Sequence, residues 1–554
     1  MTTVRDATFD VLRACELREI FANPGSTEVS FLVDLPEDLR FVLALHEGSV
    51  VGIATGHALA TGRPAFVVLH STPGLGNAVS ALATARVNRA PLVVVTGQQD
   101  RRHLALEPFL AGRLDDLAGS YPVWVAQPAI PQDVPAAIRR AWHEASYRRG
   151  PALVVVPMDD WLAETDESLG LAAPAVVRRP AAADEATAAE IANLLDGAQS
   201  PVVVVGAEAD EPDTWQALIT LVERLGCPVW QEAFGARAGF PQDHPAFAGH
   251  LPADRTSLRK TLTPYDVVLV VGAPAFRQYP YEPGPLVTPG TTVIVISDDP
   301  DTAHHSAANL SAIAAPAQTC ARLTELIRRH EPKPGEAAEA EAERLPGEAA
   351  GAGRSPAASA LPSERNVRAP GPGEALRAVH VFAALAERLP ADVVLVEESP
   401  SSRPDLHRLI PARAPRGFVS AAMGGLGFAL PAATGLRMGD PTRPVVAVVG
   451  DGSSLYGIHA LWSAAKYDCG VLFVVLSNGG YAVMDQLAQA AGGNAPWPGF
   501  DVDVAGIATS LGCPSLRIRD HATLLDTLDE VLPSLAARRH PLLLDVRVSP
   551  EPAE

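Results

Sequence analysis

Cysteine is scarce in this chain. Its 554 residues include only five cysteines, and no two of them stand in a CxxC spacing. That pattern argues against a disulfide framework and against a zinc site built from CxxC pairs. It fits a reducing compartment, and we therefore expect a cytoplasmic protein.

Positive charge and long apolar runs are lacking as well. Lys and Arg together number 44 against 64 Asp and Glu, a formal net charge of −20. Without a basic face to neutralise phosphates, the chain is not expected to bind nucleic acid. No apolar run reaches the ~18 residues of a membrane span. The N-terminal "MTTVRDATFDVLRACELREI" carries charges throughout, unlike a signal peptide, so no membrane partner is expected.

The chain is too long for one hydrophobic core. Residues 331–373 are rich in Ala, Glu, Pro and Gly with almost no large apolar residue, which predicts a flexible linker. Elsewhere short apolar runs alternate with helical segments, without the period-2 pattern of a half-exposed strand. Such runs indicate parallel sheets covered on both faces. The prediction is an α/β fold with three doubly wound parallel-sheet domains, at 1–178, 185–330 and 374–554.

The first and third of these domains look alike. "PAFVVLHSTPGLGNAVSALATARVNRAPLVVVTG" and "PVVAVVGDGSSLYGIHALWSAAKYDCGVLFVVLSNGG" both read strand, glycine-containing turn, helix, strand. The likeness indicates either two copies of one architecture or the general pattern of α/β proteins. The central domain lacks a GxGxxG fingerprint, so no FAD is expected there.

Two buried strands of the third domain each end in a polar side chain. Asp451 stands between Gly450 and Gly452, and Asn478 precedes Gly479 and Gly480. Ligands of parallel α/β sheets bind beyond the carboxyl ends of the strands. Glycines allow close backbone approach, and the N–H groups of a following helix favour a phosphate.

A diphosphate at this edge would need a hard divalent cation. A carboxylate, an amide oxygen and a backbone carbonyl suit Mg²⁺, so Asp451, Asn478 and the carbonyl of Gly480 form a candidate metal–diphosphate clamp. The alternative is two ordinary glycine turns. The 27-residue separation of the Asp and the Asn, with a second strand between them, favours the clamp.

This "GDGS…SNGG" pattern resembles the thiamin-diphosphate motif, which typically ends in NN. The resemblance extends over almost the whole chain, to the thiamin-diphosphate-dependent 2-oxo acid decarboxylases and most closely to the benzoylformate decarboxylase family. It is carried by four further segments, "NPGSTE" (23–28), "LALHEGSVVGIATGHALATGRPAFVVLHSTPGLGNAVSAL" (43–82), "GAPAFRQYPYEPG" (272–284) and "GGLGFALPAATG" (424–435). It implies pyrimidine-binding, central and diphosphate-binding domains, with thiamin diphosphate and Mg²⁺ as cofactors.

The resemblance also implies cofactor contacts. Glu47 matches the family glutamate that bonds the pyrimidine ring and sets its tautomer; alternatively it is only an acid placed at a helix start by the dipole. Leu426 matches the bulky residue that wedges beneath the bent cofactor. The remaining implied cofactor contacts are Gly424, Gly450, Gly452, Ser453 and Tyr481.

For the substrate, Ser26 matches the family serine that bonds the carboxylate of a 2-oxo acid. His70 matches a histidine that relays protons. The second family histidine is replaced by Tyr279, a weaker acid at neutral pH. Leu487 stands where the family has an aromatic wall, which indicates a different acyl group.

These features predict non-oxidative decarboxylation of an aromatic or branched 2-oxo acid to the aldehyde. One alternative is a carboligase of the acetolactate-synthase type, using the same enamine intermediate, and another is a non-catalytic cofactor-binding protein. The family implies active sites between the first domain of one subunit and the third domain of its neighbour. A homodimer or homotetramer is therefore expected.

Overall fold

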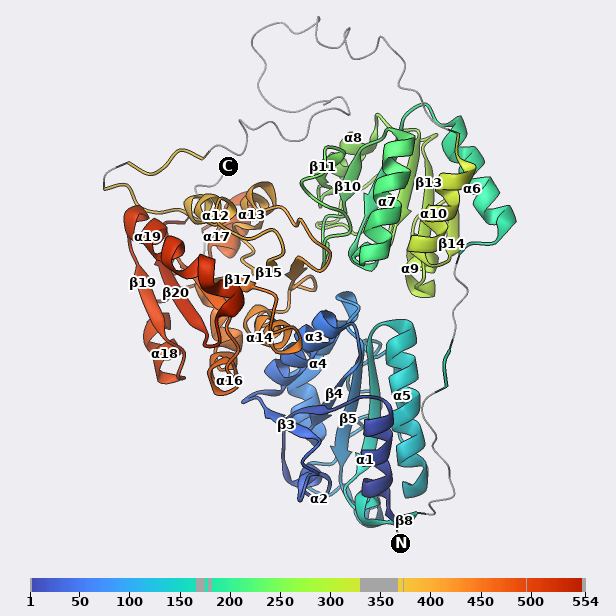
Figure 1. The fold of residues 1–554 in the computed structure, drawn as a ribbon, viewed down its shortest axis with the longest axis vertical. Helices are drawn as coiled ribbons and strands as arrows, with labels where there is room; N and C mark the ends of the chain where they lie inside the picture. Colours follow the sequence, from blue (N-terminus) through green and yellow to red (C-terminus); the bar gives the residue numbers. More distant parts are fainter. Residues whose placement is uncertain are drawn as a thin grey trace, which may run out of the picture. The chain divides into compact units, whose positions relative to one another are not determined.

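A computed structural model of the chain describes residues 2–165, 175–177, 182–328, 367–371, 373–494 and 496–550. It divides into two compact units (Figure 1): Met1–Val177 with Arg368–Leu406 and Val419–Glu554, and Arg178–Val367 with His407–Phe418. The three predicted domain ranges stay predictions. The predicted linker at 331–373 lies almost entirely outside the described residues.

The first unit begins with a six-stranded sheet, here called the N-terminal sheet, whose strands pair in parallel in the order β3-β2-β4-β5-β7-β6. Its strands are β2 (Glu19–Asn23), β3 (Arg40–Leu43), β4 (Ala65–Leu69), β5 (Leu92–Gln98), β6 (Trp124–Ala126) and β7 (Pro151–Pro157). Its main helices are α1 (Val4–Ala14), α2 (Val29–Leu32), α3 (Glu47–Thr61), α4 (Ser71–Val87) and α5 (Val134–Arg148). A short antiparallel pair, β1 (Thr2–Thr3) and β8 (Glu164–Thr165), closes this part.

The same unit contains a second six-stranded sheet, the C-terminal sheet, in the order β16-β15-β17-β18-β20-β19, apart from Phe418 and the end of α13, which are assigned to the second unit. Its strands are β15 (Val394–Glu398), β16 (Phe418–Ser420), β17 (Val445–Gly450), β18 (Leu472–Ser477), β19 (Ser515–Ile518) and β20 (Leu542–Arg547). Its helices are α12 (Ala378–Ala386), α13 (Arg403–Leu409), α14 (Ala429–Gly439), α15 (Asp451–Gly457), α16 (Ala460–Lys466), α17 (Ala482–Ala490), α18 (Val504–Ser510) and α19 (His521–Val531). Numbered along the chain, both sheets read 2-1-3-4-6-5, so the first and third domains share one architecture.

The second unit has a different topology. Its sheet follows the order β11-β10-β9-β12-β13-β14, or 3-2-1-4-5-6 along the chain, the doubly wound order of dinucleotide-binding folds. The strands are β9 (Pro201–Val205), β10 (Val229–Gln231), β11 (Phe247–His250), β12 (Val267–Val271), β13 (Thr292–Ser297) and β14 (Leu310–Ile313). The helices are α6 (Glu185–Gly197), α7 (Pro212–Leu225), α8 (Arg255–Leu262), α9 (Pro300–His305) and α10 (Pro316–Leu326). The predicted fold class of three doubly wound sheets is confirmed.

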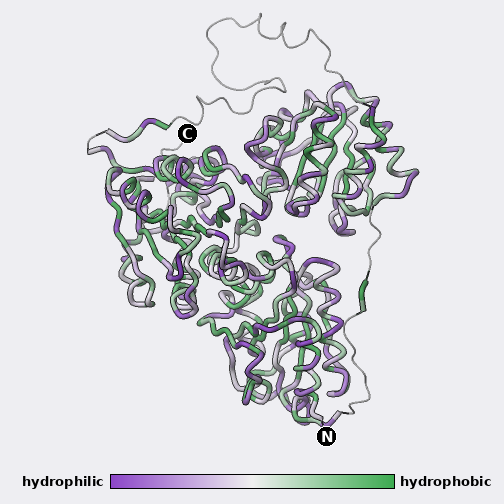
Figure 2. The backbone as a smooth tube through the Cα atoms, viewed as in Figure 1, coloured by the Kyte–Doolittle hydropathy of each residue, from purple (hydrophilic) through white to green (hydrophobic). Residues whose placement is uncertain are grey.

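The central strands of all three sheets are buried along almost their whole length, as their continuous apolar runs predict. Every residue of β5 and β9 is buried, and Figure 2 shows the strands as mostly hydrophobic segments. Helices on both faces of each sheet exclude water from it, which is why these strands do not alternate polar and apolar residues. Among the described helices, none is long and apolar enough to cross a membrane.

Helices α3 and α14 join the two sheets of the first unit into one hydrophobic core. They approach so closely that a Cβ at Gly56 would lie 2.0 Å from the carbonyl oxygen of Ala432, and one at Gly435 would lie 1.8 Å from that of Ile53. Only glycine fits at these two positions. The helix that begins with Glu47 is therefore fixed against the helix that follows Leu426.

Candidate active site

Each sheet of the first unit has one point where its strand order reverses. In the N-terminal sheet this point lies between β2 and β4, and in the C-terminal sheet between β15 and β17. Loops at the carboxyl ends of parallel strands diverge there and leave room for a ligand. The candidate residues follow these strands: Ser26 after β2, His70 after β4 and Asp451 after β17.

Glu47 lies at this edge of the N-terminal sheet as the first residue of α3. His46 caps the helix by accepting a hydrogen bond from the Gly48 N–H at 3.0 Å. The Glu47 carboxylate is buried and accepts one hydrogen bond on each oxygen, from Asn23 at 3.1 Å and from Asn77 at 3.0 Å. It is therefore a fixed acceptor rather than a solvated helix-start acid.

Ser26 and His70 occupy neighbouring turns of the same edge. Ser26 opens the 3-10 helix η1 (Ser26–Glu28) and is exposed. His70 immediately precedes α4, without a side-chain hydrogen bond to the helix start, and most of its side chain is buried. Gly74 lies between His70 and Glu47: a Cβ there would be 3.1 Å from the His70 Cβ and 3.4 Å from a Glu47 oxygen. The structure thus brings Ser26, His70 and Glu47 to one edge.

The candidate metal clamp forms at the edge of the C-terminal sheet. Asp451 is buried and accepts hydrogen bonds from the Gly452 N–H at 2.8 Å and the Gly479 N–H at 2.7 Å. The second bond ties the turn after β17 to the turn after β18, which carries Asn478 and Gly480. The Asn478 side-chain oxygen accepts from the Gly480 N–H at 3.0 Å.

This clamp has the chemistry that a magnesium–diphosphate group requires. Burial raises the pKa of Asp451, and backbone N–H donors act in the opposite direction, so a cation would compensate a charge that burial disfavours. A Cβ built on Gly480 would meet no heavy atom within 4 Å, so open space lies beside its backbone. Ser453 is buried behind the first turn, while Tyr481 packs edge-on against Phe500 with ring centroids 5.0 Å apart.

The loop that carries Leu426 is held by a buried acid. Glu398, the last residue of β15, accepts hydrogen bonds from the N–H groups of Gly427, Phe428 and Ala429 at 2.6, 2.9 and 2.6 Å. Burial raises the pKa of Glu398 to about 7, although these backbone bonds oppose the shift. Gly424 has φ +70°, with open space beside it, and Leu426 is half-buried.

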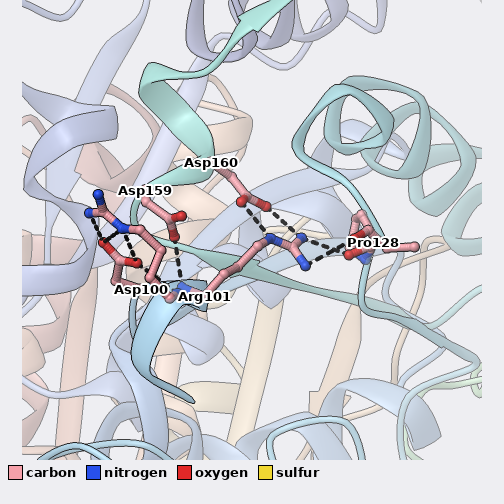
Figure 3. A network of polar contacts seen from close by, with 7 residues as sticks. Asp100, Arg101, Pro128, Asp159 and Asp160 are labelled. Carbon is pink, nitrogen blue, oxygen red and sulfur yellow. Dashed lines mark hydrogen bonds and ion pairs between the residues drawn. The ribbon is translucent and has the colours of Figure 1, made fainter. Parts of the chain in front are cut away.

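A polar network fixes the segment that follows β5 (Figure 3). Arg101 donates to both carboxylate oxygens of the fully buried Asp160, at 2.6 and 2.7 Å, and to the Pro128 carbonyl at 2.7 Å. Its backbone N–H donates to Asp159 at 3.1 Å. The network fixes the start of the segment after β5. Further along this segment, Phe109 is 86 % exposed.

No described contact connects the two remaining predicted pocket residues, Tyr279 and Leu487, with the strand ends that carry Glu47 and Asp451. Tyr279 belongs to the second unit, where its side chain is 63 % exposed. Leu487 lies on α17 and is exposed. Their roles in the substrate pocket stay predictions.

Four residues at the site were not assigned a role from the sequence. Asn23 and Asn77 hold Glu47, Glu398 holds the Leu426 loop, and Glu28 contacts His70. For Asn23 and Glu28 the strand-end segment "NPGSTE" was a signal, because acids and amides at the carboxyl end of a buried strand point to a ligand site. For the other two, spacing along the chain gave no indication of the contact.

A histidine pair beside Glu47 gives a pH prediction. His459 and Ser49 lie 2.8 Å apart (Nε2 to Oγ), and the rings of His459 and His46 are 5.1 Å apart. Burial, and then the neighbouring His46, lower the pKa of His459 to about 4, while Glu47 opposes them. The unfolded chain takes up this proton near pH 6.5 and the folded chain only near pH 4. Stability is therefore lost as the pH falls from about 6.5 to 4.

We expect His459→Gln to reduce this acid-side loss, because Gln can still bond Ser49 but cannot take up the proton. The measurement is the thermal unfolding midpoint at pH 7 and at pH 5 for both proteins, with the exposed His103→Gln as the matched control. Between pH 7 and pH 5, the unfolding midpoint of the variant should fall by fewer degrees than that of the wild-type chain or the control. An unchanged difference would contradict the assignment.

Family models match three parts of the chain. Residues 2–118 match "Thiamine pyrophosphate enzyme, N-terminal TPP binding domain", 188–323 match the central domain of the same enzymes, and 401–546 match their C-terminal TPP binding domain. Together these segments cover more than half of the chain.

Proteins that are similar over their full length indicate the same family. The chain is 36% identical to benzoylformate decarboxylase of Pseudomonas aeruginosa, covering 99% of both sequences, and 28% identical to a putative acetolactate synthase large subunit of Mycobacterium tuberculosis, covering 95% of both. The solved structure of thiamine diphosphate-dependent 4-hydroxybenzoylformate decarboxylase from Rhodococcus jostii has a TM-score of 0.88 at 32% identity, covering 99% of this chain and 100% of its own. The family indicated by the sequence motifs is confirmed, and the chain is a thiamin-diphosphate-dependent enzyme that belongs to the thiamine pyrophosphate enzyme family.

Proposed function

We propose that this enzyme catalyses the non-oxidative decarboxylation of an aromatic or branched 2-oxo acid to the aldehyde. The observation that carries the proposal is the gathering of Ser26, His70 and Glu47 at one edge of the N-terminal sheet. The full-length similarity to benzoylformate decarboxylases supports it, since the acetolactate synthases are more distant.

The chain's own residues would hold the cofactor at its two ends. Glu47 would accept a hydrogen bond from the pyrimidine ring, and the amides of Asn23 and Asn77 keep its carboxylate in place. Asp451 and Asn478, together with the Gly480 carbonyl, would bind Mg²⁺ and through it the diphosphate. When bound, thiamin diphosphate would supply the nucleophilic carbon and accept the electron pair that the broken carbon–carbon bond leaves behind when CO₂ departs.

The substrate is oriented by neutral groups. The Ser26 hydroxyl donates to the carboxylate of the 2-oxo acid without neutralising it, which suits a group that must leave as CO₂. His70 takes up and returns a proton at the carbonyl oxygen and at the carbon that becomes the aldehyde. We assign Tyr279 and Leu487 to the wall around the acyl group. A smaller wall than an aromatic one would admit a branched chain.

We further propose a homodimer or homotetramer with shared active sites. Large apolar side chains are exposed on the single chain close to the candidate site elements, among them Leu106 and Phe109 after β5 and Tyr456 on α15. Such side chains would be covered from water in an assembly of this kind, and contiguous apolar surface commonly marks a protein interface. Five free and buried cysteines are consistent with the reducing cytoplasm.

The test is product analysis with a panel of 2-oxo acids, including benzoylformate, a branched aliphatic acid and pyruvate, with and without an acceptor aldehyde. We expect equal amounts of aldehyde and CO₂, with kcat/KM for an aromatic or branched acid about tenfold or more above that for pyruvate, since each pocket-filling group contributes such a factor. Hydroxyketone as the main product would show a carboligase instead. No product from any acid would show that the proposal is wrong.

A further inference from the structure

A buried glutamate beside the proposed substrate residues has no part in the function described so far. Glu28 ends η1, two residues after Ser26, and is only 2 % exposed. Burying a carboxylate without hydrogen-bond partners is costly. The groups that bond the Glu28 carboxylate therefore indicate its role.

Glu28 is bound on both oxygens. One oxygen accepts a hydrogen bond from the Gly25 N–H at 2.8 Å and lies 3.0 Å from the Nδ1 atom of His70. The other accepts from the Thr27 hydroxyl, whose oxygen also lies 3.0 Å from His70 Nδ1. Gly97 of β5 packs directly against this carboxylate. Any larger residue would clash there, because a Cβ built on Gly97 would lie 2.0 Å from a Glu28 oxygen.

These contacts determine which nitrogen of His70 carries a proton. An ionised carboxylate can only accept hydrogen bonds, and the Thr27 hydroxyl already donates its proton to Glu28. In the contact between Glu28 and His70, Nδ1 must therefore be the donor. The Nε2 atom is then the ring nitrogen that remains for a substrate. A carboxylate that fixes the tautomer of a proton-transferring histidine is a recurring arrangement in enzymes.

The same carboxylate also sets the position of Ser26. Its bond to the Gly25 N–H closes the turn from which Ser26 projects. Glutamine keeps a side-chain oxygen that can accept from the Gly25 N–H, so Glu28→Gln should act mainly on His70 and leave Ser26 in place.

We propose that Glu28 is a positioning residue for the decarboxylation: it holds His70 in the Nδ1–H form, and its bond to Gly25 keeps Ser26 beside it. The inference rests on the proposed function. Glutamine at position 28 keeps the size but offers an NH₂ group, which can donate to Nδ1 and stabilise the opposite, unproductive tautomer.

The experiment is a double-mutant cycle on kcat with Glu28→Gln, His70→Ala and the double variant, using the best acid of the panel and holoenzyme. We expect Glu28→Gln alone to lower kcat about 100-fold with little change in KM, since inverting the tautomer in a serine-protease triad costs up to about 10⁴-fold. In the His70→Ala background the same change should cost less than about threefold, because residues that act as one unit are not additive.

Glu208→Gln is the matched control: Glu208 is a buried glutamate that accepts hydrogen bonds from the Ser297 hydroxyl and the Asp298 N–H. Its kcat should stay within about twofold of the wild type. Equal losses from Glu28→Gln in both backgrounds, or no loss at all, would overturn the proposal and leave the decarboxylase function standing. If the wild-type chain itself is inactive with every acid, both the Glu28 proposal and the decarboxylase function are wrong.

If Glu28→Gln does not fold, NMR of wild-type protein labelled with ¹⁵N-histidine gives the answer. The His70 signal is identified by its loss in His70→Ala. A proton on Nδ1 of the neutral ring is expected, and a neutral ring protonated on Nε2 would overturn the proposal.

Discussion

Replacing Glu47 by Gln should lower kcat about 10²–10⁴-fold, the range that one acid–base group contributes. The Glu47 carboxylate is buried and fixed between the amides of Asn23 and Asn77, so it can bond a protonated ring nitrogen without rearranging. Glutamine has nearly the same shape but cannot hold the negative charge that stabilises that protonated ring. The measurement is steady-state CO₂ release with saturating thiamin diphosphate and Mg²⁺.

Two controls separate this effect from a general disturbance. Glu19→Gln makes the same chemical change at the start of β2, the opposite end of the strand that Asn23 ends, and should leave kcat within about twofold. Cofactor uptake by Glu47→Gln should stay close to that of the wild type, because the metal clamp is untouched. Activity within tenfold of the wild type would show that Glu47 does not set the pyrimidine tautomer.

Replacing Asp451 by Asn should weaken binding of thiamin diphosphate with Mg²⁺ at least about 100-fold. Losing an outer partner of a metal ligand typically costs about 10–100-fold, and Asp451 is the one charged side chain in the proposed clamp. Asparagine keeps an oxygen that can accept from the Gly452 or Gly479 N–H, so the two turns should keep their shape. The measurement is calorimetric titration of the cofactor at several Mg²⁺ concentrations.

The surface residue Asp503 provides the matched control. Asp503→Asn removes a carboxylate from the same domain, where it caps α18 and pairs with the exposed Arg517. It should leave cofactor affinity within about twofold. Activity of Asp451→Asn that recovers in part at high cofactor and Mg²⁺ would fit a binding defect. Unchanged affinity would show that Asp451 is not the metal ligand.

Much of the architecture could be predicted from the sequence, for a physical reason. A strand buried on both faces must be apolar throughout, so runs such as "AFVVLH" and "VVAVVGDG" indicate parallel sheets, and polar residues at their ends indicate the ligand edge. This reasoning predicts Asp451 and His70 at strand ends, and the structure has them there.

Contacts between distant segments could not be predicted in this way. The Glu28 carboxylate faces Gly97 and His70, and Glu398 binds N–H groups about 30 residues away along the chain. Such contacts depend on which strands become neighbours, and a 2-1-3-4-6-5 order cannot be read from local periodicity. The close crossing of α3 and α14 is likewise visible only after both sheets are assembled.

The central claim is that a single coenzyme is gripped at its ring end by Glu47 and at its phosphate end by the Asp451 clamp. Its most direct test is calorimetric titration of thiamin diphosphate, with Mg²⁺ present, into the purified wild-type chain. We expect saturable uptake of about one cofactor per chain, and we expect a metal chelator to abolish it. Uptake that does not saturate, or that is indifferent to the chelator, would contradict it.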